Sequence, residues 1–285
     1  MILKKILCVV KKTELERYKV YSKKSLPPSI KKWLNLGHKN HLTFLTKFKA
    51  IASKYGLPIT YVTTNQVKDI HSKYDMIITL GGDGAFILAT KYFRKTPLLG
   101  FNSNSHKHPK QGSIGALTSG NISNLEKRLK QLKEGKFKIV PLSSLSIKIN
   151  SKLINIPVVN EIYLGNKNPY RSSDLTIIHD KKEERFNCSG IIVSTFTGST
   201  AWYKNGGGKP FKEDEFALLI REPNKDRKPT LTQMILKEKE KLTIYPNSPD
   251  HIISVDSREE IVPLKTFDKI EINYSTCNLI EVVKF

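Results

Sequence analysis

The sequence predicts an α/β domain with a mostly parallel sheet, followed by an all-β domain. In about the first 120 residues, short apolar runs alternate with segments of helical spacing, which is typical of parallel strands joined by helices. From residue 121 onward, β-rich runs follow one another between Gly, Pro, Asn and Lys. A length of 285 residues suits two domains. We expect them at 1–120 and 121–285, with the last residues free to return to the first domain.

The first domain is expected to contain four buried strands: Ile6–Val10, Ile59–Val62, Met76–Leu80 and Pro97–Phe101. A helix is expected over about 39–55, because Leu42, Leu45, Phe48 and Ala52 recur at helical spacing. Gly56 and Pro58 end it. The stretch from Thr13 to about Leu36 is polar, with a turn expected at Pro27-Pro28, and a further helix is expected at Ala85–Phe93.

The second domain begins, on this interpretation, with a helix and continues as strands. Ser123 and Glu126 have the spacing of a capping box before a helix that ends at Gly135. Strands are then expected at Ile139–Ile149, Ile154–Leu164, Asp174–His179, Gly190–Thr195, Glu215–Arg221, Lys241–Tyr245 and His251–Val255, with further strands in Lys269–Phe285.

The composition favours an anionic partner without specifying a nucleic acid. The 48 Lys and Arg exceed the 26 Asp and Glu, which gives a formal net charge of +22. The basic residues are spread out, whereas a nucleic-acid reader concentrates them, so no specific nucleic acid is expected. No apolar run is long enough to span a membrane, and no presequence is recognised, so a cytoplasmic location is expected. The cysteines Cys8, Cys188 and Cys277 have no disulfide or metal-ligand spacing.

The strongest local motif is Gly81-Gly82-Asp83-Gly84, which follows a buried strand and precedes a helix. Ligands bind at this place in open α/β sheets. The glycines let backbone amides approach a phosphate, and the helix N-terminus favours negative charge. The aspartate would repel a phosphate, so it needs a partner such as a substrate hydroxyl. An ordinary Asp-Gly turn is the structural alternative.

Two further motifs lie in the second domain. The segment from Gly190 to Trp202 holds five hydroxyl residues within seven positions, which could serve phosphate oxygens or form a plain β-turn. Asn160-Glu161 is a polar pair inside an apolar run. Its side chains need hydrogen-bond partners, which could be the edges of a ligand or solvent on a half-exposed strand.

In this order, the three motifs resemble those of the NAD kinase family, and the resemblance covers nearly the whole chain. Its signatures appear here as Gly81-Gly82-Asp83-Gly84, Asn160-Glu161 and Ser194-Thr-Phe-Thr-Gly-Ser-Thr-Ala201. The pattern is closest to the mitochondrial-type branch. The features shared with that branch are Lys12-Thr13, Arg17-Tyr18, the stretch Gly37 to Asn40, the longer loop Gly100 to Gly115, Ser189 in place of the usual Asp, and Trp202 in place of the usual Tyr.

The resemblance implies a Rossmann-like, diacylglycerol-kinase-like first domain and transfer of the ATP γ-phosphoryl group to the 2′-hydroxyl of the adenosine ribose of NAD. Asp83 would be the catalytic base. A divalent cation, usually Mg²⁺, would arrive on the ATP phosphates rather than in a protein-built site. NAD and ATP would be the partners, and the family implies a homodimer or higher homo-oligomer. NAD versus NADH as acceptor and ATP versus polyphosphate as donor stay open.

The resemblance also assigns binding residues. Glu161 would accept hydrogen bonds from ribose hydroxyls, Asn160 would address the base or a ribose, and Thr200 and Ala201 would line the dinucleotide site. The binding residues expected in full are Gly81, Gly82, Gly84, Asn160, Glu161, Ser189, Thr197, Ser199, Thr200, Ala201 and Trp202. Two departures weaken adenine or dinucleotide contacts, namely Ser189 and Ala116, which stands where an aromatic residue packs near the adenine. Asp256 is interpreted as structural.

Two other classes of function stay open at this stage. A lipid kinase or sugar kinase of the same superfamily shares the Gly-Gly-Asp-Gly loop but not the combination of the three motifs. A non-catalytic protein that binds NADP or nucleic acid is suggested by Ser189 and by the charge of +22, whereas retention of Asp83 argues against it.

Overall fold

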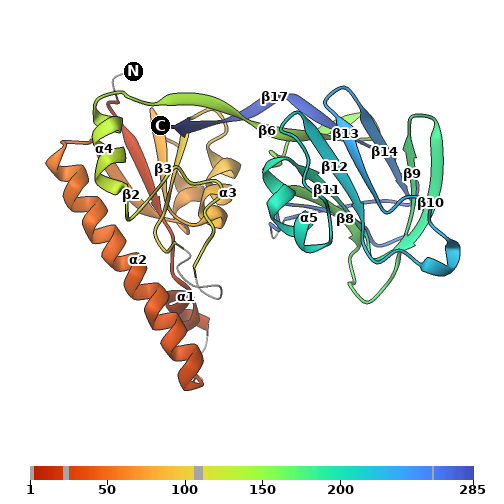
Figure 1. Ribbon diagram of the computed structural model, residues 1–285, viewed down its shortest axis with the longest axis horizontal. Helices are drawn as coiled ribbons and strands as arrows, with labels where there is room; N and C mark the ends of the chain where they lie inside the picture. The colour runs from red at the N-terminus through yellow and green to blue at the C-terminus, as the bar shows by residue number, and fades with distance from the viewer. Residues whose placement is uncertain (1–2, 22–25, 106–111, 259) are drawn as a thin grey trace. The chain divides into compact units, whose positions relative to one another are not determined.

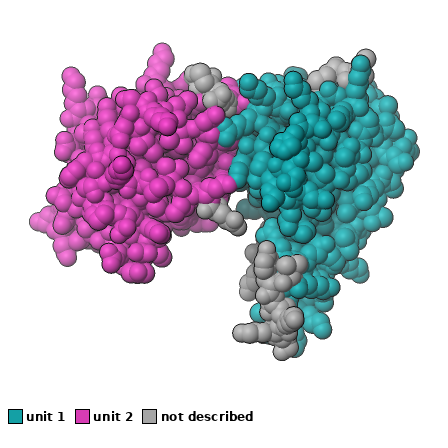
Figure 2. Space-filling view, turned by 180° about the vertical axis from the view of Figure 1, so that it is seen from behind, with its two compact units in different colours: residues 1–141, 280–285 teal, residues 142–279 magenta. Residues whose placement is uncertain are grey.

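The computed structural model describes residues 3–21, 26–105, 112–258 and 260–285. It divides into two compact units, residues 1–141 with 280–285 and residues 142–279 (Figure 2). The first unit therefore extends past residue 120 and includes the helix that the sequence analysis placed in the second domain. It also includes the last residues of the chain.

The first unit is an α/β domain with a parallel sheet (Figure 1). Its strands are β1 (Ile6–Val10), β2 (Ile59–Thr63), β3 (Met76–Gly81), β4 (Leu98–Asn102), the short β5 (Gly120–Asn121) and the end of β17 (Ile270–Lys284), and its helices are α1 (Glu14–Tyr21), α2 (Pro28–Lys54), the 3₁₀ turn η1 (Val67–Asp69), α3 (Asp83–Tyr92) and α4 (Leu125–Lys133). The order β17-β4-β3-β1-β2 is parallel throughout. The predicted fold class is thus confirmed for this unit.

The two faces of this sheet are covered by different helices. Ile6, Cys8 and Val10 alternate along β1 and share a core with Phe48 of α2 and Leu129 of α4. On the opposite face α3 approaches so closely that a Cβ built on Gly100 would lie 3.1 Å from the Phe86 ring. Both faces are therefore buried, which explains why the strands are continuous apolar runs rather than alternating ones.

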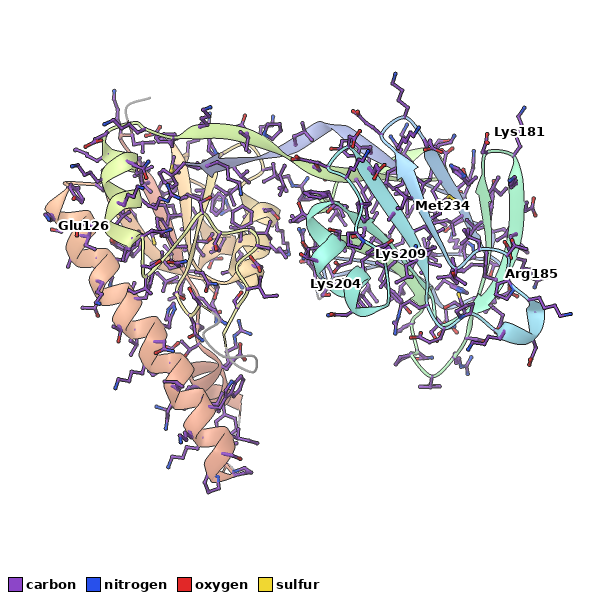
Figure 3. All side chains as sticks on the ribbon, in the orientation of Figure 1. Glu126, Lys181, Arg185, Lys204, Lys209 and Met234 are labelled. Carbon is purple, nitrogen blue, oxygen red and sulfur yellow. The ribbon has the colours of Figure 1, made fainter. Side chains whose placement is uncertain are left out.

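Three predictions for the first unit are wrong in detail. Helix α2 begins at Pro28, not near residue 39, because Pro28 occupies the first turn, where its missing N–H costs nothing. Glu14–Tyr21, in the polar stretch where only a turn was predicted, forms α1. The expected capping box is absent: the N-cap of α4 is Asn124, and Glu126, labelled in Figure 3, instead pairs with Lys54 of α2 at 2.7 Å.

The second unit consists of two antiparallel sheets around one core. One sheet has the order β13-β12-β11-β8-β15-β16, and the other continues through β10, β9, β14 and β17, with β6 and β7 beside it. The strands are β6 (Lys138–Ile149), β7 (Lys152–Ile154), β8 (Glu161–Asn166), β9 (Ser173–His179), β10 (Lys182–Cys188), β11 (Ile191–Thr195), β12 (Glu215–Ile220), β13 (Gln233–Lys237), β14 (Lys241–Pro246), β15 (His251–Val255) and β16 (Ile261–Pro263). Three short helical turns join them, η2 (Thr197–Thr200), α5 (Trp202–Asn205) and η3 (Lys225–Arg227). The expected all-β architecture is confirmed.

The strand predicted at Ile154–Leu164 is instead two strands, β7 and β8, separated by residues 155–160. The polar pair Asn160-Glu161 therefore lies at the beginning of β8, not inside a continuous strand. The charged strand β10 was not predicted, because it pairs with β9 in a hairpin whose outer side chains, such as Arg185, point into solvent (Figure 3). Among the described residues, no helix combines the length and apolar character needed to cross a membrane.

Candidate functional site

The motif Gly81-Gly82-Asp83-Gly84 lies where β3 ends and α3 begins. The strand register places Lys11 after β1, Gly81 at the end of β3 and Asn102 at the end of β4 along one edge of the sheet. This edge is formed by the carboxyl ends of parallel strands, where ligands bind in open α/β sheets.

The Asp83 carboxylate is fixed by backbone amides from the loop after β4. The Ala116 N–H donates to Oδ2 at 3.2 Å, and the Leu117 N–H donates to Oδ1 at 2.8 Å. Each carboxylate oxygen can accept a second hydrogen bond, so the group stays able to receive one from a ligand. Ala116 is thus a support of Asp83 through its main chain.

A cavity of about 310 Å³ adjoins this loop within the first unit. Gly81, Gly82 and Lys11 form part of its wall. At its wall, the His41 ring contacts the Ser103 hydroxyl at 2.7 Å, and the Ser103 N–H donates to the Gly81 carbonyl at 2.9 Å. Burial lowers the pKa of His41 to about 4, so the imidazole is neutral near pH 7 and serves as a hydrogen-bonding group.

The glycines of the motif differ in the space around them. A Cβ built on Gly82 would lie 2.4 Å from Oγ of Ser113, whereas a Cβ on Gly84 would meet no atom within 4 Å. Gly82 is therefore required by packing within the protein. The open space beside Gly84 leaves room for a ligand at the N-terminus of α3.

This difference gives a stability prediction for two matched variants. Gly82→Ala should lower the free energy of unfolding by about 1–3 kcal/mol, because Ser113 must move, and Ser113→Gly should restore it. Gly84→Ala should raise the free energy of unfolding by about 0.5–1 kcal/mol, because alanine favours a helix. Urea denaturation measures both, and equal losses in the two variants would contradict the argument.

The pair Asn160-Glu161 lies in the second unit, beside the Ser/Thr segment at the end of β11. The Thr195 N–H donates to the Asn160 carbonyl at 2.9 Å, and the Gly198 N–H donates to Thr195 Oγ1 at 3.1 Å. Ser199 is buried, whereas Thr197 and Ala201 are half-buried and Thr200 is exposed. The structure therefore brings two of the three predicted motifs together within one unit, while Asp83 belongs to the other.

Glu161 is a buried carboxyl without a hydrogen bond to one of its oxygens. Glu161 is 4% exposed, and among the described residues its buried Oε2 has no hydrogen-bond partner. Burial, together with the nearby charge of Asp256, raises its pKa from the ordinary 4.5 to about 7. An acceptor of this kind suits ligand hydroxyl groups, which would supply the missing hydrogen bonds.

The raised pKa predicts that Glu161 makes the fold less stable as the pH rises. The unfolded chain releases this proton near pH 4.5 and the folded chain near pH 7, so stability falls between these values. Relative to Glu161→Gln, the wild type should lose about 2–3 kcal/mol of unfolding free energy between pH 5 and pH 8. Urea denaturation at both pH values checks this. A parallel pH dependence of the two proteins would show that Glu161 does not titrate as described.

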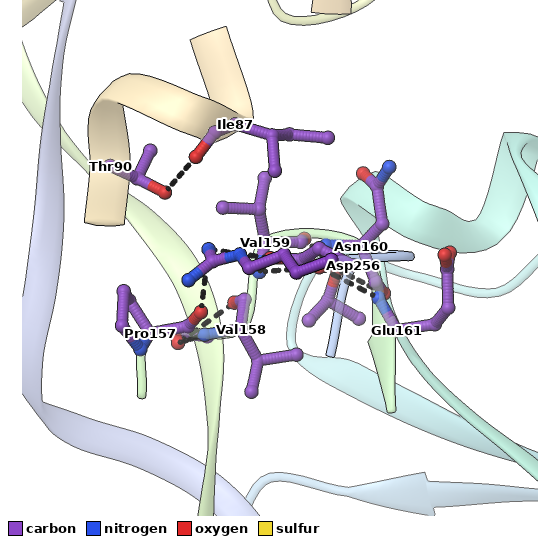
Figure 4. A network of polar contacts seen from close by, with 11 residues as sticks. Ile87, Thr90, Pro157, Val158, Val159, Asn160, Glu161 and Asp256 are labelled. Atoms are coloured by element: carbon purple, nitrogen blue, oxygen red, sulfur yellow. Dashed lines mark hydrogen bonds and ion pairs between the residues drawn. The ribbon is translucent and has the colours of Figure 1, made fainter. Parts of the chain in front are cut away.

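Asp256 lies under the same pair. Its carboxylate accepts the N–H groups of Val159, Asn160 and Glu161 and lies 3.0 Å from an Arg258 nitrogen (Figure 4). Burial raises its pKa, whereas these four donors oppose that shift and favour the ionised form. The sequence analysis interpreted Asp256 as structural and did not anticipate this contact. The available sequence signal was an aspartate directly after the predicted strand His251–Val255.

Ser189 and Trp202 form a second cluster near Tyr163. The Tyr163 hydroxyl donates to the Ser189 carbonyl at 3.0 Å, and its ring stacks on Trp202 with 5.4 Å between ring centroids. The Arg221 guanidinium lies 5.1 Å from the Trp202 ring centroid. Trp202 also packs against the core around Tyr203. Protein groups thus already contact the Trp202 ring, as expected of a core tryptophan.

The comparisons with known proteins agree on one family. A sequence model described as "ATP-NAD kinase N-terminal domain" matches residues 12–137. The NAD kinase of Flavobacterium psychrophilum is 29% identical over 250 residues, which cover 83% of this chain and 81% of that protein. The NAD kinase of Clostridium botulinum strain Alaska E43 is 31% identical over 198 residues, which cover 67% of this chain and 66% of that protein.

Solved structures share the fold over nearly the whole chain. An NAD kinase from Archaeoglobus fulgidus in complex with ATP has a TM-score of 0.69 at 20% identity and covers 98% of this chain and 93% of that one. Yeast NADH kinase complexed with NADH has a TM-score of 0.71 at 17% identity and covers 99% and 84%. The resemblance to the mitochondrial-type branch stays a prediction. Motifs, fold and relatives together establish that this chain belongs to the NAD kinase family.

Proposed function

We infer that the chain is an ATP-dependent NAD kinase in which Asp83 receives the 2′-hydroxyl of the adenosine ribose. The γ-phosphoryl group of ATP passes to that hydroxyl, so the β–γ phosphoanhydride bond breaks and the products are NADP and ADP. The observation that carries the proposal is a single carboxylate, held by two backbone amides, at the carboxyl edge of a parallel sheet. This carboxylate lies within the segment that the family model matches.

In phosphoryl transfer, positioning and charge neutralisation contribute more than covalent chemistry. Asp83 orients the hydroxyl and accepts its proton as the new O–P bond forms. The two amides hold the carboxylate still while this happens. The cavity beside Gly81 and Gly82, with Lys11 in its wall, is the proposed place for donor phosphates.

A divalent cation, Mg²⁺ in the first place, is proposed to arrive on the ATP phosphates. Mg²⁺ keeps several waters and binds phosphate oxygens together with one or two carboxylates. The described residues contain no group of three or more His, Cys, Asp or Glu that could hold a metal. Asp83 is an oxygen donor suited to such a cation. The cation would neutralise charge on the β- and γ-phosphates.

The acceptor is proposed to be held by the residues of the second unit. Glu161 offers its unpartnered oxygen to ribose hydroxyls, and Asn160 offers an amide to the base or an adjacent ribose. Thr200 and Ala201 line the path of the dinucleotide, with Thr197 and Ser199 shaping it. Trp202 is already stacked on Tyr163, which also donates a hydrogen bond to Ser189. We therefore propose that the dinucleotide contacts Trp202 and Ser189 at the edge of the cluster that these three residues form.

One assay tests the proposal. Purified protein is incubated with NAD or NADH and with ATP or polyphosphate, and NADP and NADPH are measured by a coupled dehydrogenase. Product with a nucleotide acceptor supports the proposal. Product only with diacylglycerol or sphingosine, or no kinase activity with any acceptor, would overturn it. A homo-oligomeric state and a cytoplasmic location stay predictions, which sedimentation and imaging of the tagged protein would test.

A further inference from the structure

The peptide that carries Asn160 is held from both sides by side chains of other strands. On its N–H side lies Asp256, directly after β15. The Asp256 carboxylate accepts the Asn160 N–H at 2.7 Å, the Val159 N–H at 3.0 Å and the Glu161 N–H at 3.2 Å. Figure 4 shows Asp256 against this backbone, while the Asn160 side chain points away from it.

On its carbonyl side lies Thr195, the last residue of β11. The Asn160 carbonyl accepts the Thr195 N–H at 2.9 Å and lies 3.1 Å from Thr195 Oγ1. The same hydroxyl reaches the Val159 carbonyl at 2.6 Å. Thr195 is 2% exposed and Asp256 is 7% exposed, so neither group faces solvent.

These contacts take the place of strand-to-strand hydrogen bonds just before β8 begins. Strand β8 begins at Glu161, so the peptides of Val159 and Asn160 lie just outside its ladder. An unpaired peptide at a strand end rotates freely, and its side chain then samples many directions. With their N–H groups bound to Asp256 and their C=O groups bound to Thr195, the two peptide groups that flank Asn160 cannot rotate. The directions of the Asn160 and Glu161 side chains are therefore set before a ligand arrives.

We propose that Asp256 and Thr195 are positioning residues that preset Asn160 and Glu161 to bind the dinucleotide. The proposal rests on the proposed function, because it concerns binding of NAD. Neither residue needs to touch NAD, since both act through the backbone between them. Preorganisation of this kind lowers the entropy lost on binding and so acts on affinity rather than on the chemical step.

The first test compares Thr195→Val with Thr195→Ser. Valine removes the hydroxyl at nearly constant volume, and serine keeps it. Thr195→Val should raise KM for NAD roughly 10- to 100-fold, with kcat and KM for ATP changed less than about threefold. Thr195→Ser should stay within about threefold of the wild type. Equal KM for NAD in the wild type and in folded Thr195→Val would overturn the proposal.

Asp268→Asn is the matched control for the second variant, Asp256→Asn. Asp268 also accepts a backbone N–H in the second unit, from Lys265 at 2.8 Å, but it does not contact residues 159–161. Asp256→Asn should raise KM for NAD at least about tenfold, whereas Asp268→Asn should change thermal stability alone. If both variants lower the melting temperature and leave KM for NAD unchanged, Asp256 is merely structural.

The pH dependence separates the two positioning residues. Asp256, with Arg258 paired to it, faces Glu161, and its negative charge helps to raise the Glu161 pKa to about 7. The midpoint of NAD affinity against pH should therefore move to lower pH in Asp256→Asn and stay unchanged in Thr195→Val. An unshifted midpoint in Asp256→Asn would contradict the electrostatic part of the role.

These outcomes are distinguishable from failure of the proposed function. If the wild-type protein makes no NADP, the proposed function fails, and the variants have no KM for NAD to compare. If the wild type makes NADP and every variant keeps its KM for NAD, only the positioning role fails. Calorimetric titration of NADP into each variant gives a second readout that does not depend on turnover.

Discussion

Replacing Asp83 by Asn is expected to lower kcat for NADP formation by about 10²–10⁴-fold, with binding of NAD largely kept. Asn retains the size of the side chain and one acceptor oxygen, which can accept from one of the two amides, Ala116 or Leu117, that donate to Asp83. It cannot take a proton from the ribose hydroxyl. Steady-state kinetics, with NAD binding measured by calorimetry, separates loss of chemistry from loss of affinity.

Asp75 provides a matched control for this substitution in the same unit. Its carboxylate accepts two backbone amides, those of Lys4 and Lys5, at 2.7 and 2.8 Å, just before β3 begins. Asp75→Asn therefore removes an equivalent charge at the other end of the same strand. It should change stability and leave kcat within about threefold. A wild-type rate in Asp83→Asn would disprove the base role, and an equal loss in Asp75→Asn would point to general damage.

The sequence was sufficient to predict secondary structure where the burial of apolar side chains alone decides it. The strands Ile6–Val10 and His251–Val255 have the bounds expected from their apolar residues. The sequence was insufficient where contact with another element decides the secondary structure. The N-terminal half of α2 is mostly exposed, including the apolar side chains of Ile30, Trp33 and Leu36, and only Pro28 marks its beginning. Strand β10 has a charged face and is specified by hairpin pairing with β9, which a local pattern does not reveal.

The same division applies to the candidate site. Asp83 and Glu161 could be selected as candidates from the sequence because each lies in a motif that resembles one of the NAD kinase family. Their supports could not, because the donors to Asp83 are backbone N–H groups, which every residue but proline carries. Thr195 was seen as one hydroxyl among several. Only the register of β11 against β8 shows that it reaches the Asn160 carbonyl.

Gly198→Ala is expected to have the second largest effect, because a Cβ there has no space. It would lie 2.1 Å from the Asn160 carbonyl oxygen, well inside van der Waals contact, and 2.7 Å from Oγ of Ser194. The obstructing oxygen belongs to backbone that Thr195 and Asp256 already fix, so it cannot turn aside. The turn η2 must instead move away from Asn160. We expect KM for NAD to rise at least about 100-fold and the free energy of unfolding to fall by about 1–3 kcal/mol.

Gly37→Ala is the control that separates the effect of a Cβ without space from the effect of replacing a glycine as such. Gly37 is within helix α2, and a Cβ there would lie 3.6 Å from Nδ2 of Asn104, an ordinary contact distance. Gly37→Ala should stabilise the fold by about 1 kcal/mol, as alanine does in a helix. Thermal unfolding and NAD kinetics on both variants decide the matter. If Gly198→Ala kept a wild-type KM for NAD, then η2 could withdraw from Asn160 without disturbing the acceptor site, and the close packing of these two segments would have no part in binding.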